Sequence, residues 1–246
     1  MGKRILQRRR GKAGIQFRAP IKGKIAPVRY PKHGSEGQAT VTAILDERGR
    51  SAPLAQLKLD GDRYTYVPAV AGMSVGQQVS LGPASQVNGG NIMPLSRVPE
   101  GTRVCNVEIR PGDGGRLVRA SGTSAVLFSK ANGRAIVKLP SGKNILIRDT
   151  CRATIGEVAG GGRREKPFLI AGARHHAMRA SGRVYPRMRG IAMAVVYHPF
   201  GGGRHQHPGK STSTSRNAPP GRKVGLIAPR KTGRKRLART NAEVSK

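Results

Sequence analysis

The residues best suited to chemistry gather in one stretch toward the C-terminal end of the chain. The segment "HPFGGGRHQHPGKSTSTSRNAPPGRKVG", residues 198–225, holds three histidines, three consecutive glycines and a Gly-Lys-Ser triplet. Residues of these types can cradle a phosphate, bind a metal ion or transfer a proton. Their spacing decides between these uses.

The Gly-Lys-Ser triplet at 209–211 does not fit a phosphate-binding P-loop. That motif has four residues between a first glycine and the Gly-Lys-Ser triplet, and here the first position holds Arg204. Pro208 and the histidines around it also fit no strand-loop-helix frame. Nucleotide hydrolysis is therefore not expected.

The histidines of this stretch are poor candidates for a metal site or a catalytic base. No cysteine or carboxylate accompanies His198, His205 and His207, and a glycine-rich segment does not preorganise ligands. No Gly-x-Ser-x-Gly motif occurs, and the last 81 residues contain one acidic residue with which to orient a base. We predict a protein that is not an enzyme, with no catalytic residue and no metal ligand.

The charge of the chain points to a nucleic-acid partner. Its 246 residues carry a net charge of +34, and a polyanion must neutralise the resulting self-repulsion. Residues 1–35 contain 11 Lys and Arg and no acid, and residues 166–246 contain 18 against one acid. Both ends are thus cationic arms around a nearly neutral body. No apolar run is long enough for a membrane span or a signal peptide, so we expect a cytoplasmic protein without a membrane partner.

The arms have the amino-acid composition of segments that bind RNA. Arginine offers a planar fork to phosphates, glycine lets the main chain approach RNA closely, and proline keeps the segment extended. Lacking apolar periodicity, the arms are expected to be disordered free in solution and to order on a partner. The predicted RNA contacts are Arg8, Arg9, Arg10, Lys12, Arg174, His175, His176, Arg179, Arg183, Arg187, Arg189, His198, Gly201, Gly202, Gly203, Arg204, His205, His207, Lys210, Arg216, Arg222 and Lys223.

The body between the arms predicts short β-strands. Strands are expected at 38–46 and on either side of Asp60-Gly61-Asp62, and a further Gly-punctuated segment spans 72–82, which suits a small Greek-key barrel. After a linker at 88–102, six short runs predict a second small barrel: 103–109, 116–121, 124–130, 135–140, 144–149 and 152–158. Asn132-Gly133 is its strongest turn signal. Helix is expected to be scarce. The isolated Cys105 and Cys151 predict buried apolar side chains rather than a metal or redox site.

Several motifs together resemble one family. "GNIMPLSRVPEGTRVCNVEIRPGDGGRLVRASGTSAVLF", "VKLPSGK", "CRATIGEVAGGGRREKPF", "RGIAMAVVYHPFGGGRHQHPGKS" and "SRNAPPGRKVG" follow one another in the order found in the universal large-subunit ribosomal protein two family. The resemblance covers nearly the whole chain, and forms such as "CNVE" and "HPFGGGRHQHPGK" are similar to archaeal members.

The resemblance implies a mainly β fold and a ribosomal role. It implies an N-terminal extension at 1–35, an OB-fold domain at 36–95, an SH3-like barrel at 96–170 and a C-terminal arm at 171–246 threaded into large-subunit rRNA. Family members lie near the peptidyl transferase centre, help to join the subunits and support assembly. The implied partners are rRNA, neighbouring ribosomal proteins and the small subunit, with Mg²⁺ held mainly by rRNA and no cofactor of the protein's own.

One departure from the family concerns the position matching a proposed catalytic histidine, which is His198 here. The family usually has Asn at the position of Ala194 and Asp at that of Tyr197. Without a neighbouring carboxylate to orient its imidazole, His198 loses the support that a general base needs. An RNA contact is the favoured role, and direct participation in peptide-bond formation is the alternative.

Overall fold

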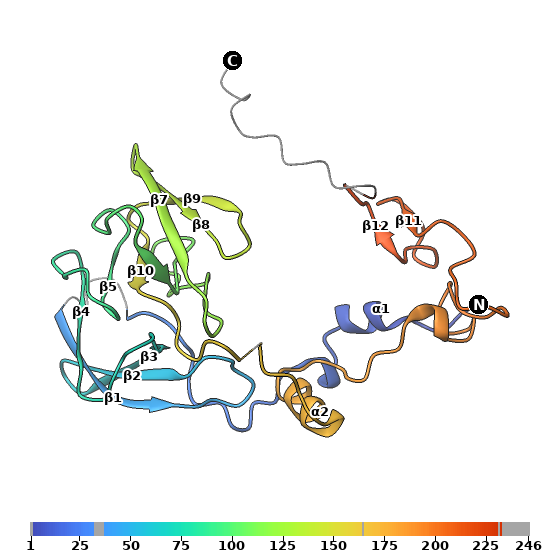
Figure 1. Cartoon of the computed structure of the whole chain (residues 1–246), viewed down its shortest axis with the longest axis horizontal. Helices are drawn as coiled ribbons and strands as arrows, with labels where there is room; N and C mark the ends of the chain where they lie inside the picture. Colours follow the sequence, from blue (N-terminus) through green and yellow to red (C-terminus); the bar gives the residue numbers. More distant parts are fainter. Residues whose placement is uncertain (1, 32–36, 164, 231, 233–246) are drawn as a thin grey trace, which may run out of the picture. The chain divides into compact units, whose positions relative to one another are not determined.

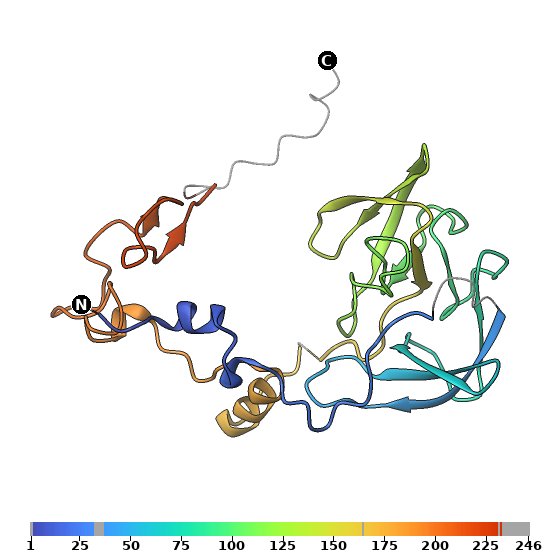
Figure 2. The same ribbon diagram turned by 180° about the vertical axis from the view of Figure 1, so that it is seen from behind.

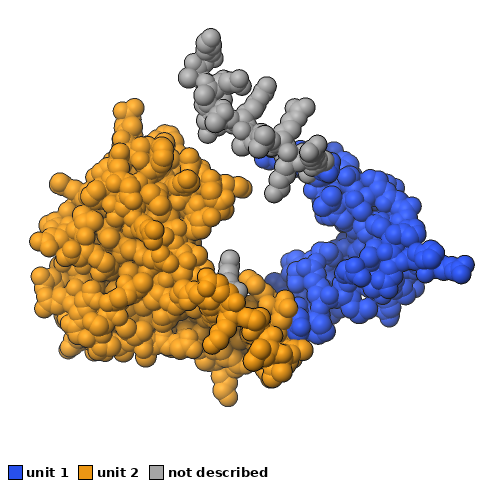
Figure 3. Space-filling view, in the orientation of Figure 1, with its two compact units in different colours: residues 1–18, 184–246 blue, residues 19–183 orange. Residues whose placement is uncertain are grey.

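The computed structural model describes residues 2–31, 37–163, 165–230 and 232 of the chain. The chain divides into two compact units, residues 1–18 with 184–246 and residues 19–183, which we call the arm unit and the body unit (Figure 3). The predicted domain junction between residues 35 and 36 and the last part of the predicted C-terminal arm, 233–246, lie outside the described residues. The predicted limits near 95 and 170 stay predictions.

The body unit is built on one sheet with the strand order β3-β2-β1-β4-β5-β10-β6-β7-β8-β9 (Figure 1, and from behind in Figure 2). This is the mainly β architecture that the sequence predicts, and it is consistent with two small barrels. The strands are β1 (Gly37–Leu45), β2 (Leu54–Leu59), β3 (Arg63–Pro68), β4 (Gln78–Leu81), β5 (Ile92–Pro94), β6 (Arg103–Cys105), β7 (Ala125–Ala131), β8 (Arg134–Lys138), β9 (Asn144–Arg148) and β10 (Arg152–Ile155).

Two predicted hairpin turns are confirmed. β2 and β3 pair antiparallel around Gly61 and Asp62, whose φ angles are 73° and 54°. β7 and β8 pair around Asn132 and Gly133, with φ angles of 51° and 71°. Asn, Asp and Gly tolerate this left-handed region better than other residues, which is why the local sequence alone locates these turns.

Two predictions about the second series of strands are wrong. Residues 116–121 form no strand and contribute one isolated bridge, Leu117 to Val107, because Val118 has a φ of 54° that breaks an extended run. The predicted strand 103–109 ends at Cys105, because Asn106 has a φ of 48°. A pattern of alternating residue types does not reveal such interruptions.

The predicted linker at 88–102 contains a strand, β5, that joins the two halves of the sheet. It pairs parallel with β4 and antiparallel with β10. Successive side chains of a strand point to opposite faces, so Ile92 packs in one hydrophobic core and Met93 in the other. Each aliphatic side chain fully buried in these cores contributes about 1.5–3 kcal/mol.

The two cores account for most of the buried apolar residues of the body. The first includes Val41, Leu57, Val67 and Val79, and the second includes Val104, Leu127, Val137 and Ile147. Both cysteines are buried as predicted, and burial raises the pKa of Cys105 to about 12 and that of Cys151 to about 11. Both thiols therefore stay protonated at neutral pH.

Part of the predicted N-terminal extension packs into the body unit. Tyr30 is 6% exposed. Its hydroxyl donates to the carbonyl of Asn106 (2.7 Å) and lies 2.6 Å from Thr154 Oγ1, while its amide donates to Gly114 (3.2 Å). Arg29 N donates to Tyr66 O on β3 (3.1 Å). Residues 28–31 thus connect β3 with the loop after β6, a role that the basic composition of residues 1–35 does not reveal.

The residues predicted as extended arms contain helices. α2 (Ala171–Ala180) belongs to the body unit, and the arm unit contains α1 (Leu6–Gly11), 3₁₀ turns at Ile15–Phe17 and Gly190–Ala192, and two short strands, β11 (Ser213–Thr214) and β12 (Leu226–Ile227). α2 is rich in alanine, the strongest helix former, with arginine and methionine close behind. This favours a helix even though no residue of α2 is buried. No helix among the described residues is long and apolar enough to cross a membrane.

Candidate RNA interface

The predicted contact residues of the N-terminal arm lie at the end of α1. Arg8, Arg9 and Arg10 occupy its last turn, and Lys12 is the C-cap. Cations are favourable at a helix C-terminus because they meet its partial negative charge. Arg8, Arg9 and Lys12 are exposed, so their charges remain available to an anionic partner.

A second group of predicted contacts lies on α2 and just after it. Arg174, His175, His176 and Arg179 are exposed along this helix, and Arg183 follows it. The rings of His175 and His176 meet edge to face, with centroids 5.6 Å apart. α2 therefore presents cations and imidazoles without any carboxylate, since residues 166–242 contain no Asp or Glu.

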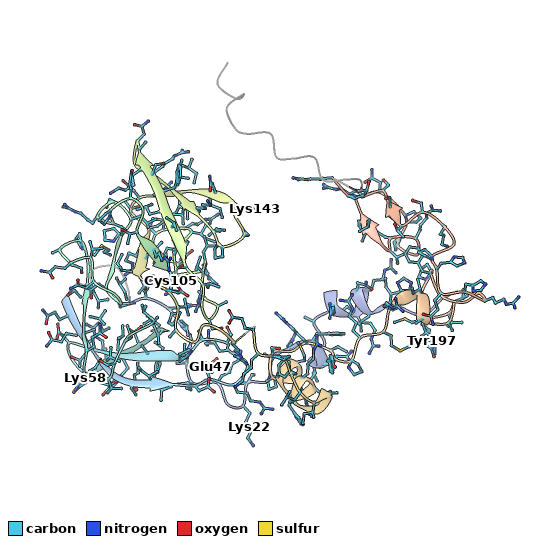
Figure 4. All side chains as sticks on the ribbon, viewed as in Figure 1. Lys22, Glu47, Lys58, Cys105, Lys143 and Tyr197 are labelled. Atoms are coloured by element: carbon cyan, nitrogen blue, oxygen red, sulfur yellow. The ribbon has the colours of Figure 1, made fainter. Side chains whose placement is uncertain are left out.

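The stretch around His198 is a compact turn in the arm unit. Tyr197 N and His198 N both donate to Ala194 O (2.9 and 3.2 Å), and Gly202 N donates to Met193 O (2.9 Å). These backbone hydrogen bonds hold residues 193–202 as a folded segment. Tyr197, which belongs to this segment, is labelled in Figure 4.

The glycines at 201–203 have different surroundings. A Cβ on Gly201 would overlap the backbone of Met193 and Ala194. Gly202 has a φ of +79°, and a Cβ there would overlap the side chain of Val195. Gly203 also has a positive φ, +83°, but its nearest other atom to a built Cβ is 3.9 Å away. Gly201 and Gly202 thus serve the turn itself, whereas Gly203 has room for a partner to approach.

The imidazole of His198 is fixed by its own turn. Its Nδ1 accepts a hydrogen bond from Phe200 N (3.1 Å), and its ring lies over Gly190, where a Cβ would overlap it. Partial burial lowers the pKa of His198 below the usual 6.5. Because Nδ1 is an acceptor, the neutral ring carries its proton on Nε2. His198 can therefore donate a hydrogen bond from Nε2.

The rest of the "HQHPGKS" stretch runs into a small packed cluster. Thr214 and Val224 are buried, and Thr214 Oγ1 donates to Val224 O (2.7 Å). β11 pairs parallel with β12. Gly225 has a φ of +82° and lies against the ring of Phe200. Lys210 is exposed at the edge of this cluster, and the Gly-Lys-Ser triplet leads into a strand instead of a phosphate-binding helix.

The remaining predicted contacts are exposed along the arm. His205 and His207 stack with centroids 6.4 Å apart. Among the described residues no group of three or more metal-binding side chains occurs. Arg187, Arg189, Arg204, Arg216 and Arg222 are exposed, and Lys223 is half-buried. The structure places these residues in the arm unit and the α2 residues in the body unit, and the individual RNA contacts stay predictions.

Comparison with known proteins gives one consistent result. A family profile described as "Ribosomal Proteins L2, C-terminal domain" matches residues 88–223. "Large ribosomal subunit protein uL2" of Korarchaeum cryptofilum is 50% identical over 244 residues, covering 98% of this chain and 99% of the relative. The chain belongs to the uL2 family. Its counterparts in Desulfurococcus amylolyticus (50% identity, 96% of this chain, 100% of the relative) and Cenarchaeum symbiosum (48%, 96% and 98%) carry the same name.

The resemblance of the sequence to archaeal members is thereby confirmed. All of these relatives are archaeal, and their full lengths are covered or nearly so. The match to the family profile begins just before β5 and ends at residue 223, so it includes α2 and the His198 turn.

Proposed function

We propose that this chain is a structural, non-enzymatic component of the large ribosomal subunit, whose body docks on rRNA and whose cationic segments bind rRNA phosphates. The observation that carries the proposal is the distribution of charge over structure. The two predicted arms contain 29 Lys and Arg, folded into turns and short helices that leave most of the described cations exposed. The rRNA of the cytoplasmic ribosome is the polyanion that can neutralise such a surface.

Assembly, subunit joining and support of the peptidyl transferase centre are the roles that the family resemblance supports. The folded turns of the arm unit suit these roles, because the cationic side chains that they carry can neutralise phosphates where rRNA helices converge. Contacts with neighbouring ribosomal proteins and with the small subunit belong to the same proposal. Mg²⁺ near the chain would be held mainly by rRNA phosphates, since hard cations prefer oxygen anions and the arms have almost none.

Direct catalysis by His198 is the alternative, and the geometry of the imidazole argues against it. A general base needs a free lone pair within reach of the proton that it removes. Nδ1 already accepts the amide of Phe200, and in the neutral ring Nε2 carries the proton. Tyr197 and Ala194 supply no carboxylate to stabilise an imidazolium. A hydrogen bond from Nε2 to rRNA fits this tautomer.

The experiment that separates the two roles compares subunits containing the native chain, His198→Ala and His198→Gln. We expect both variants to support single-turnover peptide release at the native rate once subunits of normal sedimentation are isolated. A large loss of rate in both variants, with assembly intact, would favour catalysis. Absence of the native chain from large subunits in gradients would refute the structural role itself.

A further inference from the structure

A hollow of about 240 Å³ opens in the arm unit beside the His198 turn. Residues of α1 form one part of its lining and residues 187–198 form the rest. The side chains that matter here are Leu6, Gln7, Arg187, Met188, Arg189 and Tyr197. All of them lie in the same compact unit.

The lining is more apolar than phosphate neutralisation requires. Met188 is 62% exposed and Tyr197 is 51% exposed, in a segment that is otherwise cationic. Leaving such side chains in water forfeits the free energy of burying them. Apolar groups gathered on an exposed surface mark a place where a partner binds.

The charges around the hollow restrict the ligand to an anion. Arg187 and Arg189 line it, and the lining contains no acidic residue. Gln7 adds an amide that can both donate and accept hydrogen bonds. A ligand with a flat apolar face, a polar edge and an attached phosphate satisfies all three features, and that description fits a nucleotide.

The size of the hollow indicates a single base. Pockets for drug-sized ligands measure about 300–1,000 Å³, and this hollow is smaller. Single-stranded or bulged RNA presents unstacked bases that proteins stack on aromatic side chains or guanidinium planes. Both kinds of surface are present here.

Contacts between the two segments hold the hollow in shape. Lys3 N donates to Val196 O (2.7 Å), and Lys3 Nζ lies 3.5 Å from Tyr197 Oη and 4.9 Å from the centre of its ring. Within the C-terminal segment, Arg189 Nη2 donates to Gln206 Oε1 (3.4 Å). Lys3 thus holds Tyr197 from the N-terminal segment before a ligand arrives, which lowers the entropic cost of binding.

We propose that this hollow binds one unstacked base of large-subunit rRNA, which packs against Met188 and Tyr197, with Gln7 at its polar edge and Arg187 and Arg189 at its phosphates. The inference rests on the proposed ribosomal function. It adds to that function a contact in which a base, and not only the backbone, is recognised.

Ultraviolet crosslinking of native large subunits tests the proposal without any variant. Trypsin releases residues 190–204, the peptide between Arg189 and Arg204 that contains Tyr197. After nuclease digestion we expect fragmentation mass spectrometry to find one nucleotide bonded to Tyr197 of this peptide, because a base stacked on that ring lies in contact with it. Recovery of the peptide without any nucleotide, or crosslinked to another protein, would overturn the proposal.

A variant tests the same contact by chemical probing of the rRNA. Leu6→Ala with Met188→Ala removes two apolar walls. In subunits that sediment normally, we expect the crosslinked base to react about tenfold more with a base-modifying reagent, as befits loss of a stacked contact. Ile227→Ala is the control, since Ile227 is 48% exposed on β12 in the same unit and does not line the hollow.

The outcomes distinguish the base contact from the ribosomal role. Equal reactivity of the base in native, double-variant and control subunits would refute the base contact while leaving the ribosomal role standing. Should the double variant not enter subunits, the crosslink in native subunits decides. Only absence of the native chain from large subunits would refute the function on which the proposal rests.

Discussion

At the scale of single residues, Glu108 shows how the body tolerates a buried charge. Its carboxylate is 0% exposed. It accepts hydrogen bonds from the side chain of Arg152 (3.0 Å), from Arg152 N (2.9 Å) and from Gly114 N (3.1 Å). Arg152 also donates to Pro31 O (2.9 Å). This network links the segment 28–31 to β10 through one ion pair.

Glu108→Ala should destabilise the body strongly. Removing one partner of a buried pair leaves the other charge uncompensated and costs about 3–5 kcal/mol. Denaturant unfolding would measure this loss in free energy. Asp62→Asn is the control, because Asp62 pairs with Lys58 at 2.7 Å on the surface and its loss should leave the unfolding midpoint nearly unchanged. Equal midpoints for all three proteins would show that the Glu108 network does not stabilise the fold.

His198 provides a prediction about pH. Burial holds its pKa in the folded turn below the usual 6.5, so the unfolded turn binds a proton more readily. The contribution of the neutral ring to stability is therefore complete above pH 6.5 and is lost as the pH falls through the folded pKa. A nitrogen NMR titration should show the Nε2–H form at neutral pH and a midpoint below 6.5. A midpoint above that value, or a proton on Nδ1, would contradict the geometry described for this ring.

At the scale of elements, the turn from Met193 to Gly202 depends on glycine at specific positions. Gly201→Ala places a methyl group on the backbone of Met193 and Ala194. We expect the bonds from Gly202 N to Met193 O and from His198 N to Ala194 O to open, so that these amides exchange with solvent faster. Amide exchange in assembled large subunits measures this directly, because the arms are expected to be ordered there.

Gly203→Ala is the matched control for that experiment. Its φ is +83°, so an alanine there is strained, yet a Cβ meets nothing closer than 3.9 Å; this variant therefore adds backbone strain without the overlap that Gly201→Ala creates. The amides of the Met193–Gly202 turn should exchange as slowly in this variant as in the native chain. A defect of this variant is expected in its contact with RNA instead. Equal acceleration of exchange in both variants would mean that the overlap with Met193 and Ala194 is not what opens the turn.

How far the elements follow from local sequence depends on what determines each one. The turns at Gly61 and Asn132 could be predicted because the residue types themselves favour positive φ. The break at Val118 could not, since a β-branched residue there goes against its local preference. β5 could not be predicted within the Gly- and Pro-containing linker at 88–102, because this strand is defined by its pairing with β4 and β10.

The residues of the candidate site also differ in how far the sequence predicts them. Charge and composition alone identify the cationic residues. The arginines of α1, α2 and the arm are mostly exposed, and their RNA contacts stay predictions. The hollow beside Tyr197 was not predictable, because it forms where residues 6–7 meet residues 187–198. The contact between Gly190 and the ring of His198 could not be predicted from the sequence either, because tertiary packing brings these two residues together.

At the scale of the whole molecule, positive charge without an acidic partner is concentrated in two segments of the chain. Among the described residues, four ion pairs form and all lie in the body unit; two of them are the exposed pairs of Lys58 with Asp62 and of Arg103 with Glu157. Residues 1–35 and 166–242 contain no acid at all. Cations of these segments should therefore bind phosphate and release counterions, while those paired in the body should do so much less.

The most direct test is the salt dependence of binding to transcribed large-subunit rRNA. Arg204→Gln with Arg216→Gln removes two exposed arm cations, and Lys58→Gln with Arg103→Gln removes two paired body cations, so both variants lose the same net charge. Each lost phosphate contact flattens the log–log slope by about 0.7–0.9. We predict a slope about 1.5 smaller for the arm variant and a slope close to that of the native chain for the body variant. Equal slopes for the two variants would contradict the claim that the acid-free segments, and not net charge alone, hold the rRNA.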